Sequence, residues 1–136
     1  MDFTTKIAVV VRDDLAVWQK LNVTAFLAGG LVGTWPELAG APYRDGSKQD
    51  YGPLVRQPIM VFGAAGEELS RTLARALGRG LRPSIYTRDL FSTYNDVDNR
   101  AAVADVATDA LDLVGIALHA ERKEVDKVTK GLKLHG

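Results

Sequence analysis

The stretch that decides the fold is Lys6-Ile-Ala-Val-Val-Val-Arg-Asp-Asp-Leu15. Its centre, residues 7–11, is a continuous apolar run made mostly of β-branched residues. Such a run, without polar alternation, is typical of a strand that is covered on both faces. Asp13 or Asp14 then offers a helix-capping carboxylate, and apolar residues at helical spacing follow to about residue 32. The stretch therefore predicts a buried strand that leads into a helix, as in an α/β domain.

The apolar residues of this first helix predict which of its faces is buried. Leu21, Thr24 or Ala25, Ala28, and Leu31 or Val32 fall on one side at helical spacing. We expect that side to face the sheet, and we expect the helix to end at Gly33.

The rest of the chain continues the alternation of strands and helices. We expect strands at residues 58–62, 81–87 and 111–118, and helices at 67–79 and 99–107. A closing amphipathic helix is predicted from Val125, Val128 and Leu132. Asp45-Gly46 predicts a hairpin inside the irregular segment 34–57. The prediction is a single domain over residues 1–136, with α/β architecture: a three-layer α/β/α sandwich around a mixed sheet of about four core strands.

The composition excludes several classes of function. Lys plus Arg number 17, as do Asp plus Glu, and the zero net charge gives no overall attraction to nucleic acid. The chain has no cysteine, which excludes disulfides and thiolate catalysis. His119 and His135 lack companion ligands, so we expect no metal and no cofactor, and His135 is expected in a frayed tail. The sequence shows neither a secretory signal nor an apolar run of membrane-spanning length, so we expect a cytoplasmic protein without membrane contact.

Three polar residues form a candidate catalytic set. Lys20 lies early in the first predicted helix, Asp89 follows the third predicted strand, and Thr93 comes four residues later. A lysine, a carboxylate and a hydroxyl together are able to orient water and stabilise developing charge in ester or amide hydrolysis. Taken from the residues alone, this set is one choice among many polar side chains.

A family resemblance singles out this set. The strand ending Val9-Val-Val-Arg-Asp-Asp-Leu15, the position of Lys20, the spacing of Asp89 and Thr93, and the closing run Asp126-Lys-Val-Thr-Lys-Gly-Leu-Lys-Leu134 resemble type II peptidyl-tRNA hydrolases. The resemblance implies that fold, a homodimer, and catalytic roles for Lys20, Asp89 and Thr93. Where that family carries Gln and His, this chain has Thr24 and Leu27, and residues 94–112 form an insertion. The chain therefore resembles more closely a bacterial sister family of unknown function with the same fold.

Two functional hypotheses follow from the sequence. In the first, the protein hydrolyses an ester or amide bond of an aminoacyl or peptidyl substrate; tRNA is a possible partner that the net charge does not support. In the second, it is a non-catalytic module on the same fold that binds a small molecule or a protein. The replaced Gln and His positions and the insertion favour the second hypothesis, whereas Lys20, Asp89 and Thr93 favour the first.

Overall fold

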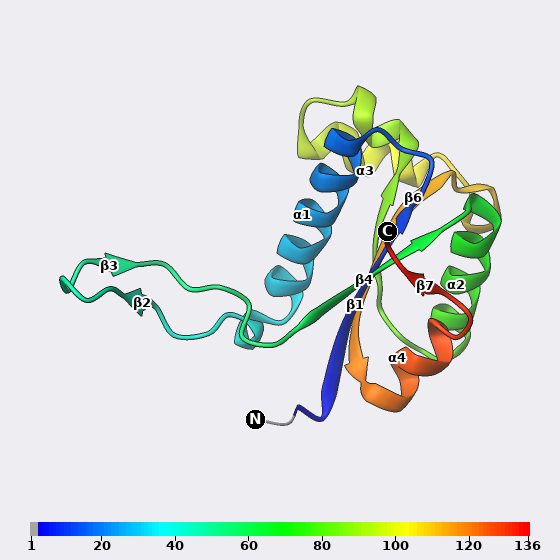
Figure 1. The fold of residues 1–136 in the computed structure, drawn as a ribbon. Helices are drawn as coiled ribbons and strands as arrows, with labels where there is room; N and C mark the ends of the chain where they lie inside the picture. Colours follow the sequence, from blue (N-terminus) through cyan, green and yellow to red (C-terminus); the bar gives the residue numbers. More distant parts are fainter. Residues whose placement is uncertain (1–2) are drawn as a thin grey trace.

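The chain folds into a mixed α/β domain around a five-stranded sheet, in a computed structural model that describes residues 3–136 (Figure 1). The strand order across the sheet is β5-β6-β1-β4-β7. The strands are β1 (Thr5–Arg12), β4 (Ile59–Ala64), β5 (Ser84–Thr87), β6 (Leu113–Glu121) and β7 (Lys133–Leu134). β1 and β4 run parallel, whereas β6 is antiparallel to both of its neighbours and β7 is antiparallel to β4. The α/β class and the mixed sheet are as the sequence predicts, with one strand more than the expected four.

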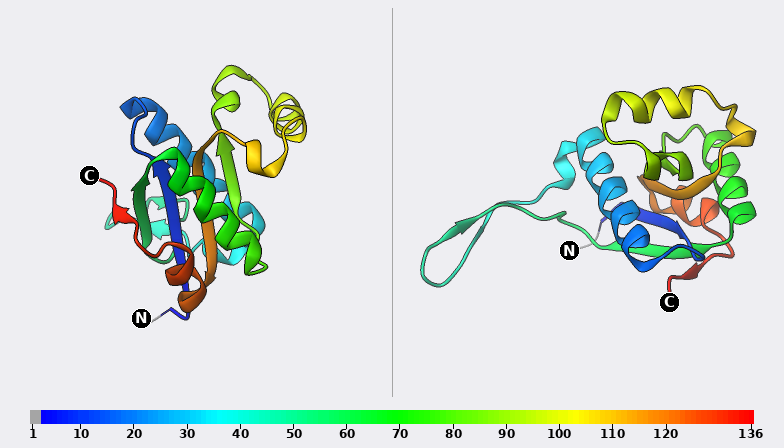
Figure 2. Two further views of the ribbon diagram at one scale, coloured as in Figure 1. Left: turned by 90° about the vertical axis from the view of Figure 1, so that its right-hand side faces the viewer. Right: turned by 90° about the horizontal axis from the view of Figure 1, so that it is seen from above.

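Helices cover both faces of the sheet (Figure 2). The four helices are α1 (Val17–Thr34), α2 (Gly66–Gly78), α3 (Asp96–Ala104) and α4 (Arg122–Val128). α1 packs on one face, where Val23, Leu27 and Leu31 join the odd-numbered residues of β1 in one core cluster. α2 and α4 pack on the other face, against Ala8 and Val10. Because both faces are covered, β1 is apolar throughout its centre, as its sequence predicts.

The side of α1 that is buried differs from the predicted one. Leu31 is buried as expected, but Leu21, also expected in the core, is 66% exposed. The buried side is completed by Val23 and Leu27, which the prediction left out. The prediction is wrong because α1 carries apolar residues around most of its circumference, so its hydrophobic periodicity does not single out one face. One side of this helix therefore covers the sheet, and an equally apolar side points away from it.

The closing segment also differs from its prediction. α4 ends at Val128, and Gly131 adopts a positive φ of 88° that turns the chain back towards the sheet. Lys133 and Leu134 then form edge strand β7 beside β4, and the His135 amide donates to the Val61 carbonyl at 2.9 Å. The expected continuous helix to Leu134 and the expected frayed His135 are both wrong, because backbone pairing with β4 holds the tail.

The segment between α1 and β4 forms a projecting hairpin, which we call the arm (residues 41–53). After the short 3-10 turn η1 (Pro36–Leu38), strands β2 (Tyr43–Arg44) and β3 (Asp50–Tyr51) form the predicted hairpin. Residues 45–49 connect them as a five-residue loop, in which Lys48 rather than Gly46 adopts a positive φ, so a two-residue turn at Asp45-Gly46 is not formed. The arm leaves the domain near the C-terminal end of α1 and extends far from the sheet (Figures 1 and 2). Every residue of the arm is exposed.

None of the helices in residues 3–136 has the length and apolar character needed to cross a membrane.

Candidate functional site

The sheet has a topological switch point between β1 and β4. These strands are parallel neighbours, yet the chain leaves β1 to form α1 on one face and leaves β4 to form α2 on the other. In open α/β sheets, the carboxyl ends of two strands that part in this way border a crevice in which ligands bind. Topology therefore directs attention to the residues just after Arg12 and Ala64.

An open hollow of about 520 Å³ lies at this point, and we call it the switch-point hollow. This volume falls in the range of small-molecule sites. Its lining comes from the β1–α1 turn, the first turns of α1 and α2, strand β4 and the C-terminal tail. The lining residues are Asp13, Lys20, Gly63, Glu68, Gly131, Lys133, Leu134, His135 and Gly136.

The charged groups of this hollow are free to meet a ligand. Among residues 3–136, neither Lys20 nor Lys133 has a carboxylate partner within ion-pair distance, and Asp13 has no cation within that distance. The Glu68 carboxylate accepts a hydrogen bond from the Ala65 amide at 2.9 Å through one oxygen, which leaves its other oxygen available. The hollow thus presents two ammonium groups and two carboxylates from separate segments of the chain.

The C-terminal tail closes one side of the hollow. The imidazole of His135 packs directly on Gly63, where an added Cβ would lie 3.2 Å from the imidazole Cδ2 atom. Its Nε2 atom is screened from solvent and has no hydrogen-bond partner within residues 3–136. A glycine on β4 therefore admits the histidine, and a nitrogen with unused hydrogen-bonding capacity is left beside the hollow.

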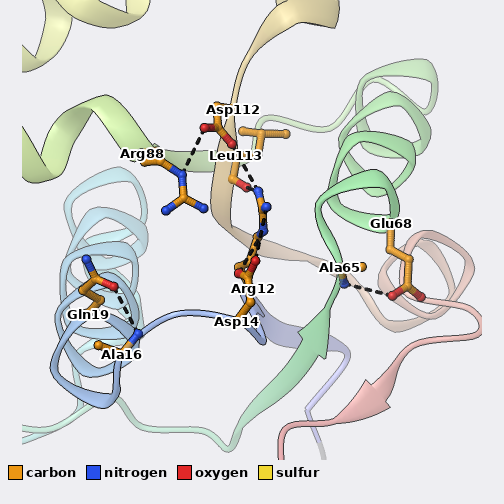
Figure 3. Close-up of polar contacts among 9 residues, drawn as sticks. All are labelled: Arg12, Asp14, Ala16, Gln19, Ala65, Glu68, Arg88, Asp112 and Leu113. Carbon is orange, nitrogen blue, oxygen red and sulfur yellow. Dashed lines mark hydrogen bonds and ion pairs between the residues drawn. The ribbon is translucent and has the colours of Figure 1, made fainter.

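A network of paired charges lies next to the hollow along the same edge of the sheet (Figure 3). Arg12 bonds to Asp14 at 3.0 Å and to Asp112 at 3.1 Å, and Asp112 also accepts from Arg88 at 3.1 Å. Asp14 is thereby committed to Arg12, and α1 begins instead after Ala16, whose amide donates to the Gln19 side chain. The expectation that Asp13 or Asp14 caps α1 is wrong. The network joins the end of β1 to the residues that follow β5 and precede β6, and its charges are satisfied internally.

The three residues predicted from the sequence do not share one hollow. Lys20 lines the switch-point hollow, whereas Thr93 lines a separate hollow of about 460 Å³ beside Trp18, Phe91 and Tyr94. The Thr93 hydroxyl donates to the Leu90 carbonyl at 3.1 Å and contacts the Asn99 side chain. Asp89 is exposed in the 3-10 turn η2 (Arg88–Ser92), outside the lining of both hollows. The inserted residues 94–99 help to line the hollow that contains Thr93.

Sequence reasoning missed four residues of the switch-point hollow. The sequence offers Asp13 only as a possible cap, places Lys133 in the closing run and His135 in a frayed tail, and gives no site role to Glu68. The position of Asp13 directly after a buried strand was a usable signal. No local signal joins Lys133 and His135 to Lys20, because only the pairing of β7 with β4 brings the tail to this edge.

The fold and the hollow define an α/β domain with a ligand-sized crevice at its switch point. The sequence profile of the DUF2000 family of proteins of unknown function matches residues 5–136, and the chain belongs to that family. The structure is similar to that of a protein of unknown function from Agrobacterium tumefaciens strain C58. The two share 50% sequence identity with a TM-score of 0.97, over 99% of this chain and 100% of the other. A comparison with curated proteins finds no match.

These comparisons correct the resemblance to type II peptidyl-tRNA hydrolases. The match to DUF2000 and the similar structure carry no sign of that superfamily, so assignment to it or to a sister family with its fold is wrong. Two of the motifs behind the resemblance were a buried strand followed by a helix, and an apolar pattern near the C-terminus; the others were the position of Lys20 and the spacing of Asp89 and Thr93. The first two arise in many α/β proteins because a sheet covered on two faces demands them.

Proposed function

We propose that the protein binds a small molecule carrying both an anionic group and an amine, as an amino acid does, in the switch-point hollow. The observation that carries this proposal is the set of unpaired charges of both signs around one ligand-sized space. Lys20 and Lys133 offer ammonium donors to a carboxylate or phosphate, and Asp13 and Glu68 offer acceptors to an amine. This is the non-catalytic hypothesis of the sequence, now attached to a particular hollow.

The position of Lys20 supports its role as the anion anchor. Lys20 is the one charged residue of α1, and it is half-buried at the edge of the hollow. A half-buried ammonium without an intramolecular partner has already lost part of its hydration, so a ligand anion gains more from pairing with it than from an exposed lysine. The network around Arg12 is different, because its cations already have partners.

The test is a matched ligand series. Thermal shift and calorimetry would compare amino acids with their N-acetyl derivatives, which lack the amine charge, and with their amides, which lack the carboxylate. A ligand present at about 100 times its Kd stabilises the folded state by about 2.7 kcal/mol. We expect the doubly charged compounds to bind best and Lys20→Ala to weaken binding about tenfold or more, because one charge-assisted hydrogen bond is lost. Lys123→Ala, at an exposed position of α4 outside the hollow, is the matched control. Equal binding by Lys20→Ala and wild type would refute the proposal.

A second candidate function is hydrolysis of an ester or amide bond of a small aminoacyl or peptidyl substrate. The observation that favours it is that the Asp13 carboxylate and the Lys20 ammonium line one hollow. Asp13 would take a proton from water as the water oxygen attacks the substrate carbonyl. Lys20 would stabilise the developing oxyanion, and the proton would then pass to the leaving oxygen or nitrogen.

Rates of three variants separate this mechanism from the one predicted from sequence. With aminoacyl and peptidyl esters and amides as substrates, we expect Asp13→Asn to lower turnover about 100-fold or more, as loss of a general base does. Asp89→Ala and Thr93→Ala should retain turnover if the chemistry occurs in the switch-point hollow. Loss of turnover in these two variants with full activity in Asp13→Asn would instead favour the set Lys20, Asp89 and Thr93. A homodimer and a cytoplasmic location remain predictions, and the surface for pairing is argued next.

A further inference from the structure

The side of α1 that points away from the sheet is apolar and bears no charge. Val17, Trp18, Leu21 and Phe26 are 58–71% exposed around this side, which we call the outward face. Trp18 and Phe26 form its border towards β5 and η2, where their rings contact Phe91 and Tyr86. Lys20, the one charged residue of the helix, lines the switch-point hollow. Contiguous exposed apolar surface marks interaction sites, and depletion of charge is typical of the core of an interface. The outward face therefore has the composition of a contact surface.

Two glycines on the outward face leave the helix backbone uncovered by side chains. At 100° per residue, Gly29 lies about 160° and Gly33 about 120° around α1 from the buried Leu27. An added Cβ at either position would meet nothing within 4 Å. Gly33 is close to the end of α1, where glycine is common, but Gly29 lies in the helix interior. A glycine there costs about 1 kcal/mol relative to alanine, and packing within the chain does not explain that cost. A second backbone approaching α1 closely would explain it.

The arm is a second feature that lacks packing partners within the described chain. Every hydrogen bond that residues 41–53 form within the described chain stays inside the arm. Tyr43 and Tyr51 are paired across its strands on one face, whereas Arg44 and Asp50 pair on the other. A two-stranded hairpin is marginally stable by itself in water. An amphipathic hairpin that stands alone is therefore expected to lay its aromatic face on another surface.

The outward face and the arm lie on the same side of the molecule. The arm leaves the body at the foot of α1 and projects from the side on which α1 lies (Figures 1 and 2). Its base is anchored by the bridge between Ala39 and Val55, so it starts from a fixed point. A partner molecule on this side of the protein would therefore contact the outward face and the arm at once.

We propose that this combined surface is the interface of a homodimer, in which the outward faces of two α1 helices pack together and each arm lies on the other copy. Seven large apolar side chains contribute, six from the outward face and the arm and one, Leu54, from the base of the arm: Val17, Trp18, Leu21, Phe26, Tyr43, Tyr51 and Leu54. Their exposed surface is on the order of 900 Å² per copy, close to the ~800 Å² per partner of a stable interface. The zero net charge means that two copies do not repel each other overall.

The oligomeric state of the full chain tests this proposal. Sedimentation equilibrium of the wild type over a range of concentrations should give twice the chain mass of 14.7 kDa. Leu21→Arg should raise the dissociation constant about 100-fold, since a charge at the centre of an apolar interface has to be desolvated. Leu77→Arg is the matched control, because Leu77 is an exposed helical leucine on α2, in the opposite layer.

The separate parts of the surface need separate variants. Tyr43→Ser tests the arm and Phe26→Asp tests a second position on α1, while circular dichroism checks that each variant is folded. We expect both to weaken the dimer and Leu77→Arg to leave it unchanged. A wild-type chain that stays monomeric at ~100 μM, more than tenfold above typical micromolar constants, would overturn the proposal. The proposal would also be overturned if the Leu21→Arg and Phe26→Asp variants folded normally and still formed the dimer. A ligand-binding result for Lys20→Ala bears on neither outcome.

Discussion

The two sides of helix α1 are alike in composition and opposite in environment. On the inward side, Val23, Leu27 and Leu31 are at most 3% exposed and pack on the sheet. On the outward side, Trp18, Leu21 and Phe26 are all more than half exposed. Both sides are apolar, so hydrophobicity does not decide which one is buried by the chain itself. The difference teaches that the second apolar side is suited to a surface outside this chain.

A pair of leucine truncations gives the largest expected contrast between the two sides. Leu27→Ala should lower the free energy of unfolding by about 2–5 kcal/mol, because it leaves a cavity between α1 and β6. Leu21→Ala should change it by less than about 0.5 kcal/mol at protein concentrations where the chain is monomeric. Urea denaturation followed by circular dichroism measures both. Similar losses for the two variants would contradict the assignment of sides.

A glycine opposite the inward side gives the next effect. An added Cβ on Gly115 in β6 would lie 2.4 Å from the Val23 Cγ1 atom and 2.8 Å from the Leu27 Cδ1 atom. Gly115→Ala should therefore push α1 from the sheet and cost about 1–3 kcal/mol, as overpacking does. Its unfolding midpoint in urea is the measurement. An unchanged midpoint would mean that α1 is free to shift on the sheet.

The corresponding change on the outward side should have the opposite sign. Gly29→Ala meets open space and removes a poor helix former, so it should stabilise the monomer by about 0.5–1 kcal/mol. The same methyl group should weaken the proposed dimer by holding two α1 backbones apart. Denaturation at low concentration and sedimentation at high concentration measure the two effects. A stabilised monomer with unchanged dimerisation would place Gly29 outside the interface.

The smallest expected effect is a pH dependence of stability, which comes from His119 on β6 beside the end of α1. Burial lowers the pKa of His119 below 6.5, an effect that Arg56 reinforces and Glu37 opposes. The imidazole packs edge-on against Trp35, with ring centroids 4.9 Å apart, and its Nε2 atom lies 3.0 Å from the Thr5 hydroxyl. A lone histidine at the end of a predicted strand is expected to be solvated, whereas His119 is half-buried.

The sign of the pH effect follows from proton binding. As pH falls below 6.5, the unfolded chain binds a proton at His119 that the folded chain still rejects. Stability therefore declines until the pH reaches the folded pKa. His119→Asn should show a smaller decrease in Tm between pH 7.5 and 5.5 than the wild type. An equal decrease in both proteins would show that other groups control the acid response.

Local chemistry in the sequence predicted the elements of the fold well. The apolar run at residues 7–11 required a strand covered on both faces, and Asp45-Gly46 required a turn. The candidate site was predicted less well. Of Lys20, Asp89 and Thr93, Lys20 alone lines the switch-point hollow, and the hollow's other charged groups come from distant segments. Local sequence patterns do not predict which distant segments of the chain meet in the folded protein.

The sequence by itself determined the α/β class, the buried strand β1 and the presence of a hairpin between α1 and β4, because each depends on residues close together in the chain. The tertiary structure alone decided which side of α1 is covered, since both sides satisfy the same hydrophobic pattern. It alone also brought His135 onto Gly63, and Asp13, Lys20 and Glu68 to one hollow. Strand order and the opposite departures of the chain from β1 and β4 produce that convergence, and they depend on contacts between residues far apart in sequence.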